Sequence, residues 1–262
     1  MKLLLVGLLL AWQSALAGSN PFPQAASAYL VQVDQVTLWQ KQAPRRLPPA
    51  SLTKLMTALL VLDSLPLDAT VSISAAAARE SGSRLKLKSG SRYSTQALLQ
   101  ATLLHSANDA CHALAEHVAG SEHRFVEQMN ARASAMGLRD THFENACGHD
   151  ADGHYSSALD LAILAQHALE NAFIRATAGL ATASIRSLDG KYRHQLTNKN
   201  ALIGRYRGIA GLKTGYTANA GKCLIAYAVR DQKQVLLVLL NAPNRWWDAK
   251  DMLDLAFSHA AN

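Results

Sequence analysis

The sequence has few of the features that mark a membrane protein, a disulfide-rich scaffold or a nucleic-acid-binding protein. Only three cysteines occur in 262 residues, whereas small secreted scaffolds held by disulfides have a much higher density. Beyond residue 17 no apolar run approaches the ~20 residues of a membrane span. No dense run of lysine and arginine indicates a nucleic-acid partner. Internal repeats and low-complexity linkers are also missing, so one sizeable core, or one domain with a subdomain, is expected.

The cysteines Cys111, Cys147 and Cys223 are odd in number and far apart. In an exported protein they permit one disulfide with a free thiol, or three buried thiols. We expect mostly buried thiols, because a chain with 49% hydrophobic residues can build a core that needs no covalent cross-link.

The N-terminus indicates export. Met1 and Lys2 precede an apolar stretch, residues 3–12, and Ala15-Leu16-Ala17 resembles a cleavage site. This is the pattern of a secretory signal peptide, so residues 1–17 are expected to be removed and the mature protein to be periplasmic or otherwise extracytoplasmic. No stable membrane anchor is predicted. The formal net charge of +7 suits a polyanionic surface such as a cell wall.

Hydrophobic patterning predicts strands near both ends of the chain and mostly helices or loops over residues 64–205. One sheet completed by the two termini, with a helical insertion beside it, is therefore expected, which is an α+β fold. The expected strands are 28–33, 36–40, 211–215, 223–229 and 234–240, and the expected helices begin near Ala50 and cover 94–104, 108–118, 122–136, 156–169 and 250–257.

The stretch from Pro48 to Thr57 carries the first chemical signal. Two prolines precede a run with helical spacing, so Ser51 and Lys54 lie one turn apart on the same face. Serine is a useful nucleophile only when a base takes its proton, and lysine can be that base if burial or another cation lowers its pKa. Free N–H groups in the first helical turn suit an oxyanion. Alone, the short S-x-x-K pattern is also consistent with an amphipathic helix and an exposed Lys54.

Two more short motifs add chemistry. Ser106-Ala107-Asn108 occupies the break between two expected helices, where the polar pair can point into a cleft or can simply cap a helix. Lys213-Thr214-Gly215 lies on an expected edge strand, which offers free N–H and C=O groups to an extended peptide. Its lysine and threonine would add donors for a carboxylate, although an ordinary strand end is consistent with the same residues.

The three motifs occur in the order S-x-x-K, S-x-N and K-T-G, at residues 51, 106 and 213. Together they are typical of penicillin-binding proteins and class A β-lactamases. The chain resembles the serine D-alanyl-D-alanine carboxypeptidases, the low-molecular-mass penicillin-binding proteins, over roughly residues 25–258. The segments that carry the resemblance are 49–57, 104–110, 136–138, 155–158, 211–217 and 220–221.

This resemblance implies the penicillin-binding-protein and β-lactamase type of fold. Residues 18–262 would form a single DD-peptidase catalytic domain with a helical insertion over about 64–205 and no C-terminal β-domain. The implied activity removes the terminal D-alanine from peptidoglycan stem pentapeptides through an acyl-enzyme, without a cofactor or metal. Penicillins and other β-lactam antibiotics would acylate the same serine as covalent inhibitors.

The resemblance also implies a role for each catalytic residue. Ser51 would attack the carbonyl between two D-alanines and Lys54 would take its proton. Ser106 would relay that proton to the departing amine, and Asn108 would hold Lys54 and the substrate amide. Lys213 would help to keep Lys54 neutral, because like charges disfavour each other's charged form.

Substrate contacts are implied for the residues around the third motif. Thr214 and Arg245 would bind the terminal carboxylate, and Gly215 would let the substrate backbone approach. The backbone N–H groups of Ser51 and Tyr216 would form an oxyanion hole, in which one donor is worth roughly 3–4 kcal/mol.

The sequence departs from the family pattern at three places. Ala107 stands where glycine is common, Tyr216 where histidine is common, and Cys147-Gly148-His149 where a loop often reads His-Gly-Leu. These changes leave the reacting groups intact. They leave substrate preference open, and the missing anchor leaves membrane attachment open.

Four alternatives remain. A class A-like β-lactamase needs a glutamate for deacylation, but Glu144-Asn145 lacks the E-x-x-x-N spacing. A metal site is suggested by the crowding of residues 142–154, but zinc and calcium spacings are absent and a polar loop near the active-site rim is expected. The chain could also be a DD-endopeptidase that cleaves D-alanyl cross-links, or a non-catalytic peptidoglycan-binding module. The crowded residues are His142, Cys147, His149, Asp150, Asp152 and His154.

Overall fold

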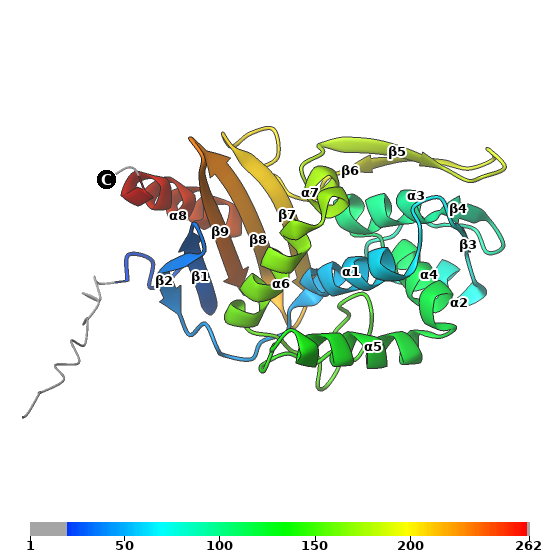
Figure 1. Cartoon of the computed structure of the whole chain (residues 1–262), viewed down its shortest axis with the longest axis horizontal. Coiled ribbons are helices and arrows are strands. Elements are labelled where there is room, and N and C mark those ends of the chain that lie inside the picture. The colour runs from blue at the N-terminus through cyan, green and yellow to red at the C-terminus, as the bar shows by residue number, and fades with distance from the viewer. Residues whose placement is uncertain (1–19, 261–262) are drawn as a thin grey trace, which may run out of the picture.

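A computed structural model describes residues 20–260 and contains the expected antiparallel sheet built from both ends of the chain (Figure 1). The α+β prediction is confirmed. The expected signal peptide over residues 1–17 lies outside the described residues. The five strands run in the order β2-β1-β9-β8-β7, with β1 at Ala28–Val33, β2 at Val36–Lys41, β7 at Ile209–Thr217, β8 at Gly221–Arg230 and β9 at Lys233–Leu240.

Both faces of the sheet are covered, which explains why β9 is apolar along most of its length. Leu237 and Leu239 face the core beneath α8 (Arg245–Ala260), whereas Val238 and Leu240 face the core shared with α6 (Ala158–Glu170). Successive side chains of a strand point to opposite faces, so a strand between two helical layers needs apolar residues at every position.

A helical region lies beside the sheet, and α1 (Lys54–Ser64) runs through its centre (Figure 1). Ser121 and Ser157 cap the helices that follow them, and Gly137 ends α5 with a positive φ of 72°. The elements around α1 are the short 3₁₀ turn η1 (Ala50–Thr53), α2 (Ala75–Ala78), α3 (Thr95–Gln100), the π-type turn η2 (Ala101–His105), α4 (Asn108–Ala119), α5 (Glu122–Ala135) and α7 (Ala172–Ala178).

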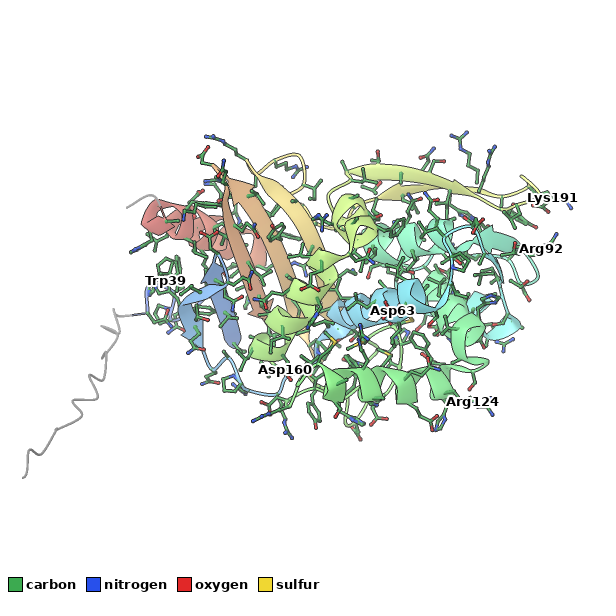
Figure 2. The ribbon with its side chains drawn as sticks, viewed as in Figure 1. Trp39, Asp63, Arg92, Arg124, Asp160 and Lys191 are labelled. Carbon is green, nitrogen blue, oxygen red and sulfur yellow. A yellow bond between two sulfur atoms is a disulfide. The ribbon has the colours of Figure 1, made fainter. Side chains whose placement is uncertain are left out.

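Residues 64–205, expected to be mostly helices or loops, also contain strands that the hydrophobic patterning did not predict. Two small antiparallel pairs lie there, one of β3 (Thr70–Ser72) with β4 (Arg92–Ser94) and one of β5 (Thr182–Arg186) with β6 (Arg193–Thr197). Each strand has one fully buried position, so a period of two residues cannot emerge from the sequence. Lys191, between β5 and β6, and Arg92 lie at the end of the molecule far from the sheet (Figure 2).

The last helix was expected at 250–257 but begins at Arg245. Trp246 and Trp247 have little helical periodicity with the residues that follow, and only Ala249, Met252, Leu253 and Ala256 are buried. Among residues 20–260, no helix combines the length and the apolar character that a membrane crossing requires.

The expectation of mostly buried thiols is also wrong. Cys111 on α4 and Cys147 form a disulfide, and Cys223 is a buried free thiol. The two bonded residues are 36 positions apart, and folding brings their Cα atoms to 6.0 Å, a normal disulfide separation. Spacing in the sequence cannot reveal such a pairing.

Candidate active site

Ser51 and Lys54 meet where η1 passes into α1. The Lys54 side chain is fully buried, and its Nζ donates to Ser51 Oγ at 3.0 Å. Two further acceptors hold the same nitrogen: Asn108 Oδ1 at 2.8 Å and the Cys147 carbonyl oxygen at 2.5 Å. Ser51 itself is only half-buried. The alternative interpretation, in which Lys54 is exposed to solvent, is therefore excluded, because every proton of the Lys54 ammonium group faces a partner inside the protein.

Burial controls the charge of Lys54. It lowers the pKa of the ammonium group to about 7, and the negative charge of Glu80 acts in the opposite direction. Lys213 and Lys54 also repel each other, because the charge of Lys54 lowers the pKa of Lys213. A lysine with a pKa near 7 is neutral in a large fraction of molecules at neutral pH, so it can accept the proton of a serine that lies 3.0 Å away.

The second motif lies in the break between η2 and α4, as expected. Ser106 adopts the left-handed conformation, with φ 60° and ψ 33°, and its Oγ accepts a hydrogen bond from Lys213 Nζ at 3.0 Å. Asn108 donates through Nδ2 to the Ser81 carbonyl at 2.7 Å. Neither side chain caps α4, because the N-cap position is Ala107. Both polar side chains are thus available for the lysines.

Strand β7 forms the free edge of the sheet and brings the third motif to the same place. Lys213 is buried, and its pKa lies well below the usual range because of burial and then because of repulsion from Lys54 and Arg245. Sterics favour glycine at position 215, because a Cβ there would lie 3.0 Å from the Pro49 carbonyl oxygen. A Cβ at this position would also lie 3.2 Å from the Ser51 amide nitrogen. Strand β7 therefore passes directly against the Ser51 turn.

The remaining predicted residues lie along the same strand end. Thr214 is buried and Tyr216 is exposed, with 66% of its surface accessible. Arg245 donates through Nη1 to the carbonyls of Gly215 at 2.7 Å and Cys223 at 3.1 Å. Its buried Nε has no partner among the described residues. Arg245 is thus fixed to β7 and β8 at Gly215 and keeps unused donor capacity there.

Sequence reasoning missed the supports behind the lysine. The Cys147 carbonyl accepts from Lys54, and Gly148 follows with φ +82°. A Cβ on Gly148 would lie 2.0 Å from the Ala50 carbonyl oxygen, so only glycine can occupy this position. The departure at residues 147–149 was visible in the sequence, but a carbonyl acceptor has no sequence signature.

The polar segment over residues 142–154 distributes its side chains among several partners. His149 Nε2 lies 2.9 Å from Glu80 Oε2, and His154 Nε2 lies 2.9 Å from Thr53 Oγ1. Asp150 Oδ1 accepts from Thr217 Oγ1 at 2.5 Å, which links the segment to the end of β7.

Glu144, the glutamate considered for a β-lactamase, pairs with His142 at 3.2 Å on the surface. Its carboxylate is not among the three partners of Lys54, which are Ser51, Asn108 and Cys147. The described residues thus give Glu144 no contact with the nucleophile's base. A deacylating role for this glutamate has no geometric support.

The fold and these contacts define a site in which a serine hydroxyl lies against a buried lysine at the edge of an antiparallel sheet. The model of the D-alanyl-D-alanine carboxypeptidase family, peptidase S11, matches residues 16–244, and this chain belongs to that family.

Relatives and solved structures agree with the family. The chain is 37% identical over 244 residues to D-alanyl-D-alanine carboxypeptidase DacF of Bacillus subtilis, covering 90% of this chain and 62% of DacF. It is 39% identical to DacD of Escherichia coli, covering 74% of this chain and 52% of DacD. The chain thus spans between half and two thirds of these two relatives. The crystal structure of the Streptomyces K15 DD-transpeptidase superposes with a TM-score of 0.85 at 30% identity, covering 92% of this chain and 100% of that one.

Proposed function

We propose that the protein is a serine DD-carboxypeptidase that removes the terminal D-alanine from peptidoglycan stem pentapeptides. The observation that carries this proposal is the buried Lys54 ammonium nitrogen 3.0 Å from Ser51 Oγ, with a pKa near 7. The substrate class is proposed from the family, whose members are named for cleavage between two D-alanines.

In the proposed acylation step, Ser51 Oγ attacks the carbonyl carbon of the penultimate D-alanine while Lys54 takes the hydroxyl proton. The amide C–N bond then breaks, and Ser106 passes a proton to the departing amine. Water hydrolyses the resulting ester and frees Ser51. Backbone N–H groups of Ser51 and Tyr216 would hold the developing oxyanion, and the close approach of Gly215 to the Ser51 amide supports this arrangement.

The substrate carboxylate would lie near Lys213, Thr214 and Arg245. An anion entering there would favour the charged form of Lys213, whose pKa is lowered by burial and by neighbouring cations. Arg245 keeps a free Nε donor beside Gly215. The substrate peptide would run along the free edge of β7, which offers its backbone groups for pairing.

We further propose that the protein acts outside the cytoplasm after export and that β-lactams acylate Ser51. The N-terminal pattern and the family's peptidoglycan substrates support this location. A fluorescent penicillin tests the chemistry directly: the wild type should be labelled covalently, and Ser51→Ala should not. Labelling of Ser51→Ala at the wild-type rate would remove Ser51 from its role.

A second candidate is transfer of the acyl group to an amine instead of water. It is favoured by the likeness to the Streptomyces K15 DD-transpeptidase, whose whole length the chain covers. Product analysis with a pentapeptide, with a pentapeptide plus an amine acceptor, and with a cross-linked muropeptide separates the activities. Free D-alanine without acceptor product supports the carboxypeptidase, and cleavage of the cross-link supports the endopeptidase alternative.

A further inference from the structure

A carboxylate with two imidazole partners lies beside the active-site turn. Glu80 follows α2, and its side chain is only 13% exposed. Its Oε1 lies 2.6 Å from His112 Nδ1, and its Oε2 lies 2.9 Å from His149 Nε2. The two histidines come from different elements, α4 and the loop of residues 145–149. Glu80 therefore joins these two elements through both of its oxygens.

The loop 145–149 is fastened to α4 at two consecutive residues of that helix. The disulfide ties Cys147 to Cys111, and Glu80 ties His149 to His112. Between the two fastenings, the loop places the Cys147 carbonyl on Lys54 Nζ and Gly148 against Ala50. The position of one Lys54 acceptor thus depends on one covalent link and one hydrogen-bonded link.

The backbone after Glu80 supports the other acceptor. The Ser81 carbonyl accepts from Asn108 Nδ2 at 2.7 Å, and the Ser83 carbonyl accepts from Asn108 N at 2.7 Å. The Asn108 amide therefore presents its oxygen to Lys54 at 2.8 Å. Glu80 stands between the segment that orients Asn108 and the loop that carries Cys147.

Charges around Glu80 are mixed and close. His112 also faces Glu116 at 3.4 Å and Glu122 at 3.9 Å. The hydrogen bond that His112 donates to Glu80 raises the pKa of His112. Burial acts to raise the pKa of Glu80, but the hydrogen bonds that it accepts from both histidines hold that pKa below its usual range. Glu80 is therefore an anion at neutral pH. Its field favours the charged form of Lys54, against the effect of burial.

We propose that Glu80 is a positioning residue for the general base: with His112 and His149 it holds the loop 145–149 and the Asn108 support in place around Lys54. This inference rests on the proposed function. It gives Glu80 two separable effects, a mechanical one through its oxygens and an electrostatic one through its charge.

The experiment measures the rate of acylation by a fluorescent penicillin against pH in the full-length protein. In Glu80→Ala the hydrogen bonds to both histidines are lost, and the maximal acylation rate, reached at high pH, should fall roughly tenfold to a hundredfold. In Glu80→Gln the amide still bridges the two imidazoles, so this maximal rate should be largely restored. Loss of the negative charge should lower the pKa of Lys54, so the acylation rate should rise at a lower pH than in the wild type. Glu127→Ala and Glu127→Gln remove an equal charge from the exposed side of α5 and serve as matched controls.

Both effects are required. The inference is overturned if the maximal acylation rate of Glu80→Ala equals that of Glu127→Ala. It is also overturned if the acylation rates of Glu80→Gln and Glu127→Gln rise over the same pH range. A loss of folding in Glu80→Ala is recognised by circular dichroism, and His149→Ala, which removes only the link from Glu80 to the loop, then replaces it with the same expected fall. Wild type and controls must be labelled for this test. If they are not, the proposed function fails, and this inference with it.

Discussion

Gly148 lies so close to Ala50 that a Cβ on the glycine would come within 2.0 Å of the Ala50 carbonyl oxygen. The contact presses the loop 145–149 against the residue before the nucleophile. Ala50 itself has a positive φ of 49°, so both sides of the contact use unusual backbone conformations. The geometry of the Ser51 turn is therefore set by backbone packing as much as by side chains.

Gly148→Ala should be strongly destabilising and should abolish penicillin labelling, because the added Cβ meets backbone on both Ala50 and Ser51. Gly190→Ala is the matched control: it has φ +75° and no atom within 4 Å of the added Cβ. The free energy of unfolding of the control should fall by only about 1 kcal/mol, because alanine is strained in the left-handed conformation. Urea unfolding monitored by circular dichroism measures both, and equal losses would contradict the steric account.

The acylation rate should rise with pH through an ionisation near 7, because only neutral Lys54 accepts a proton. Lys54→Arg cannot lose its proton at accessible pH, so it should acylate roughly 10²–10⁴-fold more slowly. Stopped-flow or quenched labelling between pH 5 and 9 would measure this increase of the acylation rate with pH. A profile flat across this range would remove Lys54 from the role of base.

Stability should depend on the same lysine with a defined sign. The pKa of Lys54 is about 7 in the folded protein, against an ordinary lysine pKa of 10.5, so between these pH values the unfolded chain binds more protons. The free energy of unfolding of the wild type, compared with Lys54→Met, should therefore increase as pH rises from about 7 to 10.5 and should be flat below 7. Urea titrations of both proteins across this range would measure the difference. A difference that decreases with rising pH would contradict a lowered pKa.

Lys213→Gln should weaken substrate capture and move the rising part of the acylation pH profile to higher pH. Lys213 donates to Ser106 Oγ at 3.0 Å, so its loss removes a cation from the carboxylate site and a partner from the proton relay. Repulsion between the two lysines lowers the pKa of Lys213 and acts on both groups, so removing Lys213 should raise the pKa of Lys54. Steady-state hydrolysis of a peptide ending in two D-alanines should show a raised KM. An acylation profile that stays at its wild-type pH would contradict the coupling between the two lysines.

The disulfide gives a direct chemical prediction. Denatured but unreduced protein should take up one iodoacetamide, at Cys223, and three after reduction. Replacing Cys111 and Cys147 together by alanine should lower the free energy of unfolding by about 2–5 kcal/mol. Cys223→Ala, which removes a thiol without a covalent link, should cost less. Uptake of three iodoacetamides before reduction would contradict the pairing.

The α+β class and the contact between Ser51 and Lys54 could be predicted from the sequence, because S-x-x-K is a local pattern whose two side chains lie near their own backbone. Ser51 and Lys54 are one helical turn apart, and that spacing fixes their contact whatever surrounds them. The strands of the main sheet were also predictable, since their apolar runs are long and lie between turn residues. The short strands β3 to β6 were not, because each has one fully buried residue.

The supports of the site could not be predicted for a different reason. Glu80 meets His149 across 69 positions, and Cys111 meets Cys147 across 36. Such pairings depend on how α4, the loop and the end of α2 pack together, and periodicity holds no information about them. The Cys147 carbonyl is a backbone group that every residue possesses, so no choice of amino acid could mark it.

The neighbours β1 and β9 in the central sheet come from opposite ends of the chain. Asp34, just after β1, accepts from the amide of Gln234 across 200 residues. Closing so long a loop costs entropy before any strand contact repays it, which slows folding. During synthesis, β1 can pair only with β2 until the last strands leave the ribosome. The polypeptide is therefore unable to complete this sheet until β9 has been made, so one edge of β1 stays without its partner strand while all of the intervening helices are synthesised.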